Sequence, residues 1–147
     1  MHILYDFPMP PSANKQLTIS KGRMIKTSAA RLFSEQVRLY GVRKWREIEK
    51  IKKDIKEGDL LQIDCYFIFL DSRLVGKKGQ IKKLDANNFL KSCLDGVASI
   101  LGIDDKYFMA NHVEKIKCVN QSEEQAILVI RPAALRTLSQ LTATLSP

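Results

Sequence analysis

The alternation of hydrophobic and polar positions predicts a chain built from short strands and two amphipathic helices. Residues 1–7 alternate loosely and are rich in β-forming side chains, so we expect a strand that ends at the proline-rich segment 8–11. The longest apolar run is 60–70 (LLQIDCYFIFL), which is β-branched, aromatic and partly alternating. It predicts a buried central strand.

A first β-hairpin is expected near the N-terminus. Residues 17–20 and 24–27 are β-prone and flank the segment Lys21 to Arg23, whose central glycine is typical of a tight turn. The turn is basic, and Lys26 adds a further positive charge. Such a tip suits a phosphate backbone, and it is equally typical of a solvated turn.

Two stretches carry apolar residues at helical spacing. Ser28 has the side chain of an N-cap, and a long helix is expected over 29–53, with an imperfect apolar stripe near Gly41. A second helix is expected over 86–101, closed by Gly102 at the C′ position. The apolar positions are Leu32, Val37, Leu39, Tyr40, Val42, Trp45, Ile48 and Ile51 in the first helix, and Leu90, Cys93, Leu94, Val97 and Leu101 in the second.

The C-terminal third completes the predicted architecture. Residues 112–119 and 125–131 alternate well and are separated by a short polar segment, which indicates a second hairpin. The order strand, hairpin, helix, strand, helix, hairpin predicts an α+β domain with a mixed or antiparallel sheet and two main helices. Pro132 ends the last strand, and the remaining residues form a polar tail.

Composition narrows the class of partner. The formal net charge is +8 and the pI is about 9.5, which favours a polyanionic partner: nucleic acid first, an anionic membrane surface second. A soluble basic protein without such a partner has the same balance. The 147 residues, 45% of them hydrophobic, fit one globular domain with a core.

The cysteines indicate in which cellular compartment we expect the protein. Cys65, Cys93 and Cys118 are flanked by apolar residues and match no zinc or redox spacing, so we expect buried free thiols and a reducing cytoplasm. The N-terminal residues do not have the pattern of a signal peptide. The most apolar run is too short to span a bilayer, so no membrane contact is expected.

Acidic residues gather at both ends of the second predicted helix, although the protein is basic. Asp85 stands at its N-cap position, and Asp104 and Asp105 follow its C-terminal glycine. Along the helix, Lys91 and Asp95 share one polar side, four residues apart. Taken singly, Asp85 is explained as a cap, and Lys91 with Asp95 as a surface ion pair.

A shared site for these acids requires more than sequence spacing. A 16-residue helix is about 24 Å long, so Asp105 cannot approach Asp85 along a straight, isolated helix. The site therefore needs a shorter helix with the chain folding back, or a second subunit. Carboxylate oxygens suit Mg²⁺ or Mn²⁺, which promote phosphodiester cleavage, while surrounding lysines and arginines hold the polyanion.

At this point the residues resemble a known family, the RusA-type Holliday junction resolvases of bacteria and their prophages. The family pattern is Asp-x-Asp-Asn-x-x-Lys-x-x-x-Asp, followed about ten residues later by Asp-Asp. The corresponding stretch here runs from Asp85 to Asp95 (DANNFLKSCLD) and is followed by Asp104-Asp105. The segment Pro10 to Asn14 also resembles the family's Pro-Pro-Ser-x-Asn. The resemblance covers roughly residues 3–131. We therefore expect a RusA-like endonuclease domain over 1–131, followed by a C-terminal tail over 132–147.

The resemblance implies a homodimeric α+β enzyme that uses Mg²⁺ to resolve four-way DNA junctions by paired nicks in recombination and repair. It implies that Asp85 and Asp105 bind the metal ion, with Asp104 as the less certain member of its pair, and that Lys91 is the catalytic lysine. Asn88 and Asp95 would support the site. The residues expected to contact DNA are Lys15, Lys21, Arg23, Lys82 and Lys83.

One position departs from the family pattern. Asn87 stands where the family has the second aspartate, and an amide oxygen can ligate Mg²⁺ but brings no charge. The alternatives are a nuclease that tolerates Asn87, one that recruits Asp95 or Asp104, or a junction-binding protein with weakened cleavage. A basic interaction module, in which Asp85 is only a cap and Asp104-Asp105 only a turn, is the alternative outside this family.

Overall fold

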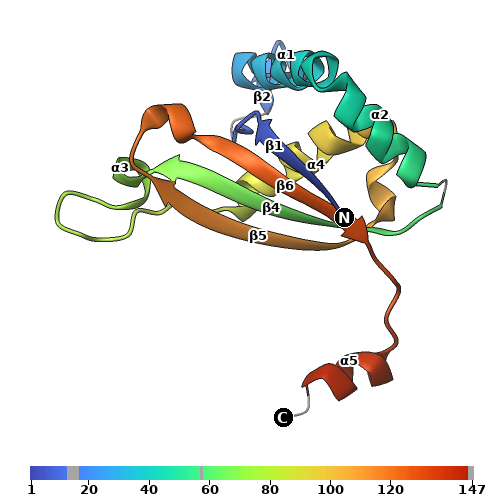
Figure 1. Ribbon diagram of the computed structural model, residues 1–147. Coiled ribbons are helices and arrows are strands. Elements are labelled where there is room, and N and C mark those ends of the chain that lie inside the picture. Colours follow the sequence, from blue (N-terminus) through green and yellow to red (C-terminus); the bar gives the residue numbers. More distant parts are fainter. Residues whose placement is uncertain (13–16, 57, 146–147) are drawn as a thin grey trace.

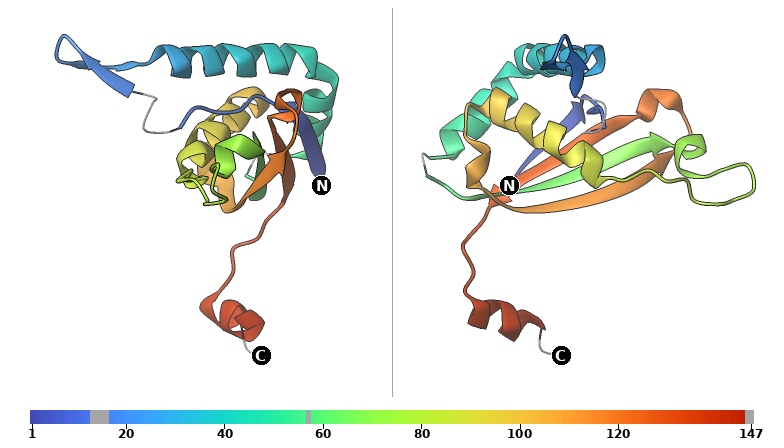
Figure 2. Two further views of the ribbon diagram at one scale, coloured as in Figure 1. Left: turned by 90° about the vertical axis from the view of Figure 1, so that its left-hand side faces the viewer. Right: turned by 180° about the vertical axis from the view of Figure 1, so that it is seen from behind.

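A four-stranded mixed sheet forms the centre of the protein in the computed structural model, which describes residues 1–12, 17–56 and 58–145. The strands lie in the order β1 (His2–Phe7), β6 (Gln125–Pro132), β4 (Leu61–Leu70) and β5 (Phe108–Cys118). The helices α1, α2 and α4 cover one face of this sheet (Figures 1 and 2). The predicted α+β class with a mixed sheet is therefore confirmed.

The central strand is β4, as the apolar run predicted. Its alternate residues Ile63, Cys65, Phe67 and Phe69 are fully buried against the helices. The intervening positions lie on the opposite face of the sheet, because successive side chains of a strand point to opposite sides. There Asp64 accepts hydrogen bonds from Gln62 and Arg131, which satisfy its buried carboxylate.

The predicted hairpin of β5 with β6 is wrong. Both strands exist, but β4 lies between them: β5 pairs with β4 in parallel, and β6 pairs with β4 in antiparallel orientation. The helix between β4 and β5 makes the crossover that a parallel pair requires. A 3₁₀ turn at Gln121–Glu123 then carries the chain past β4, and Glu124 accepts a hydrogen bond from the backbone N–H of Leu70 at 2.8 Å.

The crossover helix α4 (Asn87–Leu101) ends at Gly102, whose φ of 70° is the left-handed conformation expected at C′. A Cβ at Gly96 would lie 3.2 Å from the Phe7 ring, so this glycine allows α4 to approach β1 and α1 closely. The buried face differs from the predicted stripe, because Leu90 and Leu94 are only half-buried. The buried residues are Phe89, Ser92, Cys93, Gly96, Val97 and Leu101.

The long helix expected over 29–53 is two helices, α1 (Ser28–Arg43) and α2 (Trp45–Asp54). Lys44 leaves the helical conformation between them, and this change of direction lets both helices follow the curved core. The N-cap is Thr27 and not Ser28: its hydroxyl accepts a hydrogen bond from Ala30 N–H. Four of the predicted apolar positions are exposed instead of buried: Leu32, Leu39, Val42 and Trp45.

The first predicted hairpin is confirmed. Strands β2 (Leu17–Ser20) and β3 (Arg23–Lys26) pair in antiparallel register around Lys21 and Gly22. Both turn residues have positive φ, which a two-residue hairpin turn of this kind requires. Figure 2 shows the hairpin projecting beyond α1 and away from the sheet.

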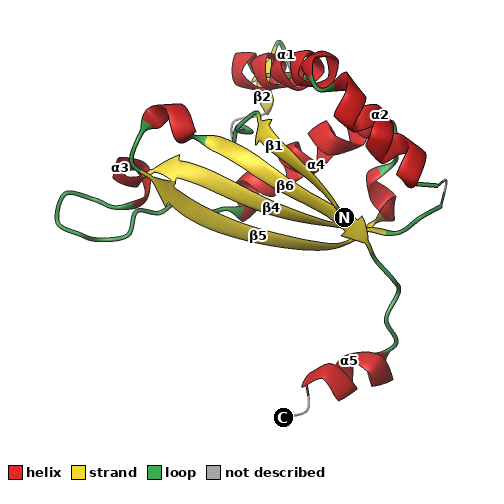
Figure 3. Ribbon diagram, in the orientation of Figure 1, coloured by secondary structure: helices red, strands yellow, loops and turns green. Residues whose placement is uncertain are grey.

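The remaining elements are short. The loop after β4 begins with α3 (Asp71–Leu74), a 3₁₀ turn (η2, Asp105–Tyr107) precedes β5, and α5 (Leu138–Leu145) lies apart from the sheet (Figure 3). The three cysteines are buried and free, as predicted. None of the described helices is long and apolar enough to cross a membrane.

Candidate active site

The N-terminal end of α4 is held by Asp85. Its carboxylate accepts a hydrogen bond from Asn87 N–H at 3.0 Å, and its carbonyl oxygen accepts one from Asn88 N–H at 3.2 Å. The predicted hydrogen bond between the Asp85 carboxylate and Asn87 N–H is therefore present, but α4 begins one residue later than expected and its N-cap residue is Ala86 instead of Asp85. Asp85 and Asn87 are exposed at the end of the helix, where the helix dipole favours negative charge.

A lysine from the sheet anchors the segment that leads into this end. Lys115 lies on β5, and its ammonium donates a hydrogen bond at 2.9 Å to the carbonyl oxygen of Leu84. Leu84 packs against the core and directly precedes Asp85. The contact therefore fixes the backbone beside Asp85 and places a cation next to this segment.

The polar side of α4 carries Asn87, Lys91 and Asp95, which are all exposed, as their four-residue spacing predicts. Partial burial raises the pKa of Asp95, and Asp105 raises it further, whereas Lys91 and Lys26 lower it. These charges are therefore close enough to interact. Lys91 and Asp95 lie on one side of α4, and the negative charge of Asp105, beyond the end of the helix, contributes to the raised pKa of Asp95.

The other acidic pair follows α4. Asp104 caps the 3₁₀ turn: its carboxylate accepts a hydrogen bond from Lys106 N–H at 3.0 Å and lies 3.2 Å from the Lys106 ammonium. These contacts hold the pKa of Asp104 below its ordinary value, and the hydrogen bond from Lys106 N–H has the largest effect. Asp104 is thus engaged within its own turn, whereas the charge of Asp105 contributes to the raised pKa of Asp95 on α4.

The two groups of acidic residues lie at opposite ends of α4. The 15 residues of α4 span about 22 Å between Asp85 and the C-terminal turn. In the described part of the chain, no three His, Cys, Asp or Glu residues come together in a group that could hold a metal ion. Within one described chain, the length of α4 therefore separates Asp85 from the acidic pair that follows the helix.

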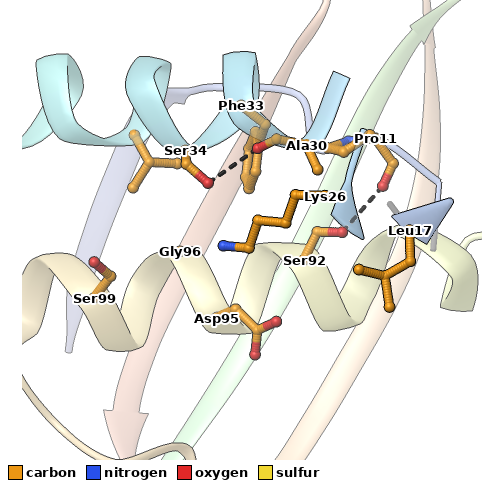
Figure 4. Close-up of a pocket in the computed structure, with 11 residues that line it drawn as sticks. Pro11, Leu17, Lys26, Ala30, Phe33, Ser34, Ser92, Asp95, Gly96 and Ser99 are labelled. Carbon is orange, nitrogen blue, oxygen red and sulfur yellow. Dashed lines mark hydrogen bonds between the residues drawn. The ribbon is translucent and has the colours of Figure 1, made fainter. Parts of the chain in front are cut away.

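A pocket opens beside the middle of α4. It has a volume of about 250 Å³ and lies between the β2–β3 hairpin, α1 and α4. Figure 4 shows Asp95 on its α4 side, Lys26 extending across it from β3, and Ser34 and Ser99 toward one end. Its position next to Asp95 makes it continuous with the polar side of α4.

The residues expected to contact DNA lie in two places. Lys21 and Arg23 are exposed at the turn of the β2–β3 hairpin. Lys82 and Lys83 are exposed in the segment before α4, where the Lys82 ammonium donates to Ser72 O at 2.5 Å and closes the loop after β4. Lys15 lies outside the described residues.

Sequence reasoning missed the position of two cations. Lys26 was expected only as part of a basic hairpin, and it lines the same pocket as Asp95. Lys115 was not singled out, because alternation along β5 does not reveal which loop a side chain reaches. The parallel register of β4 with β5, which brings Lys115 opposite Phe67, was the missing information.

The chain thus combines exposed basic residues with acidic residues at both ends of one short helix. A sequence model of the family described as endodeoxyribonuclease RusA matches residues 7–129. The chain therefore belongs to the RusA endodeoxyribonuclease family, and the expected resemblance is confirmed. A search of curated proteins gave no match.

Membership of the family establishes the general activity. The protein is an endodeoxyribonuclease of a family that resolves Holliday junctions and acts on branched DNA. Resolvases of this family generally depend on a divalent metal ion. The match extends from the end of β1 into β6, so it includes the hairpin, α4 and both acidic ends.

Proposed function

We propose that the protein is a Mg²⁺-dependent, structure-selective endonuclease that resolves four-way DNA junctions by paired nicks in recombination and repair. The observation that carries this proposal is the family match over a chain that retains Asp85, Lys91 and Asp105 on or beside one helix. The exposed basic residues of the hairpin and of the segment before α4 supply attraction to the phosphate backbone. The buried free thiols support a cytoplasmic location.

A second copy of the chain completes the proposed site. β5 is an edge strand of the sheet; its N-terminal end follows Asp105, and Lys115 in its C-terminal half contacts the segment of Asp85. If two β5 edges pair in antiparallel orientation, Asp105 of one copy moves toward Asp85 of the other. A two-fold homodimer of this kind has two such sites, one for each of the paired nicks.

The proposed residue roles follow from this arrangement. Asp85, Asn87 and the acidic pair Asp104 and Asp105 of a second copy supply oxygen ligands of the kind that Mg²⁺ prefers. A bound Mg²⁺ ion activates water and stabilises the leaving oxygen in phosphodiester hydrolysis. Lys91 stabilises negative charge on the phosphate.

Other side chains support this site. Asn88 and Asp95 flank Lys91 on α4, and we propose that they position its side chain. Lys15, Lys21, Arg23, Lys82 and Lys83 hold the DNA backbone in the proposal.

The competing function is a junction-binding protein with weakened cleavage. Asn87 favours it, because a neutral amide at a ligand position lowers affinity for a divalent cation. The two functions share the same DNA-binding surface and differ only in catalysis.

Incubation of the purified protein with a labelled four-way junction and Mg²⁺ or Mn²⁺ separates these functions. Symmetric nicks that disappear in Asp85→Asn support the nuclease, and asparagine keeps the cap of α4. Tight binding without nicks, converted to cleavage by Asn87→Asp, supports the junction-binding protein. Absence of any affinity for branched DNA contradicts both.

A further inference from the structure

We propose that the pocket between the β2–β3 hairpin, α1 and α4 binds one unpaired nucleobase of the DNA, and that it prefers a base with an exocyclic amino group. The inference rests on the proposed function, since the centre of a branched junction is where bases unpair most easily. It adds a base-binding site to a surface that otherwise contacts phosphates.

The size and the walls of the pocket suit a single base. Its volume of about 250 Å³ is just below the roughly 300–1,000 Å³ of pockets for drug-sized ligands, so it accommodates one ring system. Leu17, Ala30, Phe33 and Val37 supply apolar walls, which match the apolar faces of a base. Bases bound outside a duplex are commonly held between apolar or aromatic side chains.

The polar groups of the pocket suit the edge of a base. The Asp95 carboxylate accepts hydrogen bonds, as Asp and Glu do from the amino group of cytosine. The ammonium of Lys26 donates, and it extends across the same pocket. The Ser34 hydroxyl donates to Ala30 O at 3.0 Å, which leaves its oxygen as an acceptor.

Two other ligands fit less well. A phosphate would be repelled by the Asp95 carboxylate and would contact apolar walls that cannot hydrogen-bond to it. A divalent metal ion needs several oxygen ligands, and Asp95 is the single carboxylate among the described lining residues. A half-apolar, planar group with an N–H donor satisfies both the walls and Asp95.

The position of the pocket connects it to both parts of the DNA surface. Lys26 ends β3, so it lies at the base of the basic hairpin, and Asp95 lies one turn beyond Lys91 on α4. A nucleotide whose base enters the pocket therefore has its phosphate between the hairpin and the Lys91 side of α4. In this way the pocket would set which phosphate reaches the catalytic groups.

The test measures binding in EDTA, where no cleavage occurs. The DNA ligands in this test are four-way junctions with one extra unpaired residue at the branch, which is 2-aminopurine, cytosine, thymine or an abasic site. We expect the wild-type protein to bind the 2-aminopurine and cytosine junctions about tenfold more tightly than the abasic junction, or about 1.4 kcal/mol, with thymine weaker than cytosine. The 2-aminopurine fluorescence should change on binding.

Two variants and a control sharpen this test. Ser99→Phe places a large side chain in the pocket from an exposed position of α4. The affinity of this variant for every junction should fall to the affinity for the abasic junction. Asp95→Asn should remove the preference for cytosine over thymine. Ser122→Phe, an identical change in the exposed turn after β5, should alter neither property.

Equal affinity of the wild-type protein for base-containing and abasic junctions overturns the pocket proposal and leaves the proposed function intact. The same is true if Ser99→Phe and Ser122→Phe behave alike. A short single strand with one 2-aminopurine between abasic residues tests the pocket without a junction. If its fluorescence responds to the wild-type protein but not to Ser99→Phe, while no junction binds, the pocket stands and the junction function fails.

Discussion

The two ends of α4 hold their acidic residues in different ways. At the N-terminal end, Asp85 caps the helix through Asn87 N–H, and Lys115 from β5 fixes the preceding backbone. At the C-terminal end, Asp104 is engaged by Lys106 in its own 3₁₀ turn, and the charge of Asp105 contributes to the raised pKa of Asp95 on the helix. One end is anchored to the sheet, and the other is organised locally.

This difference underlies the proposal that each chain carries two half-sites. The helix separates the acids by its own length, while the edge strand β5 runs from one acidic end to the other. Two copies related by a two-fold axis would place the N-terminal acidic end of α4 in one copy beside the C-terminal acidic end of α4 in the other. The predictions below test the roles assigned to the two ends, and they begin with the largest expected effect.

The substitution Lys91→Met should have the largest effect on cleavage. It removes the cation assigned to the phosphate while keeping a long side chain, so we expect kcat to fall about 10²- to 10³-fold. Junction affinity should change little, because the basic hairpin remains. Single-turnover cleavage and a separate binding titration measure the two quantities, and Lys77→Met in the exposed loop after β4 serves as the control.

Restoring a negative charge at position 87 should strengthen Mg²⁺ binding at the N-terminal end of α4. Asn87→Asp adds a carboxylate in the first turn of α4, where the helix dipole favours it. We expect the Mg²⁺ concentration for half-maximal cleavage to fall about tenfold, since the ion gains a charged ligand in place of an amide. A magnesium titration of cleavage rate checks this, and an unchanged midpoint would argue against Asn87 as a ligand position.

Loss of the hydrogen bond from Lys115 on β5 should slow cleavage less than loss of a proposed metal ligand. Lys115→Met removes the hydrogen bond to Leu84 O, and we expect kcat to fall about 10-fold or less with KM nearly unchanged, as for supporting contacts around a metal ligand. Lys115→Arg should restore most of the activity. Lys117→Met is the matched control, because its ammonium lies 3.8 Å from Asp71 and away from α4.

The smallest expected effect concerns pH and Asp95. Partial burial raises its pKa above the ordinary value of 3.8, and Asp105 adds to the shift, while Lys91 and Lys26 oppose it. Between that value and the raised one, the folded protein binds the proton more tightly than the unfolded chain. The contribution of Asp95 to stability therefore falls as pH rises through this window.

The variant Asp95→Asn has no such titration. Its Tm relative to the wild-type protein should increase from about pH 3 to about pH 7, as measured by thermal unfolding across that range. A Tm difference that stays constant with pH would show that Asp95 titrates alike in the folded and unfolded states.

Much of the fold could be predicted because the signals are local. The apolar run of β4, the Lys21-Gly22 turn and the closing Gly102 each specify conformation within a few residues. The pairing of β5 could not be predicted, because alternation identifies a strand but not its neighbour. The break at Lys44 was also missed, since the charged residues around it continue a helical pattern.

Some features of the candidate site could likewise be predicted from local sequence, and others could not. The position of Asp85 and the shared side of Lys91 and Asp95 follow from helical spacing. Lys115 and the pocket beside Asp95 depend on contacts between residues far apart in the sequence. Six polar positions of the family motif were sufficient to identify the family, yet they could not show whether the folding of one chain or a second subunit would bring the two acidic ends of α4 together.

Subunit complementation tests the central claim most directly. Asp85→Asn and Asp105→Asn are each expected to abolish junction cleavage. If each site combines Asp85 of one copy with Asp105 of the other, refolding the two variants together at equal amounts creates heterodimers with one intact site. Half of the dimers are then mixed, so about a quarter of the sites should be active and should nick a single strand. A mixture as inactive as either variant alone would contradict the shared site.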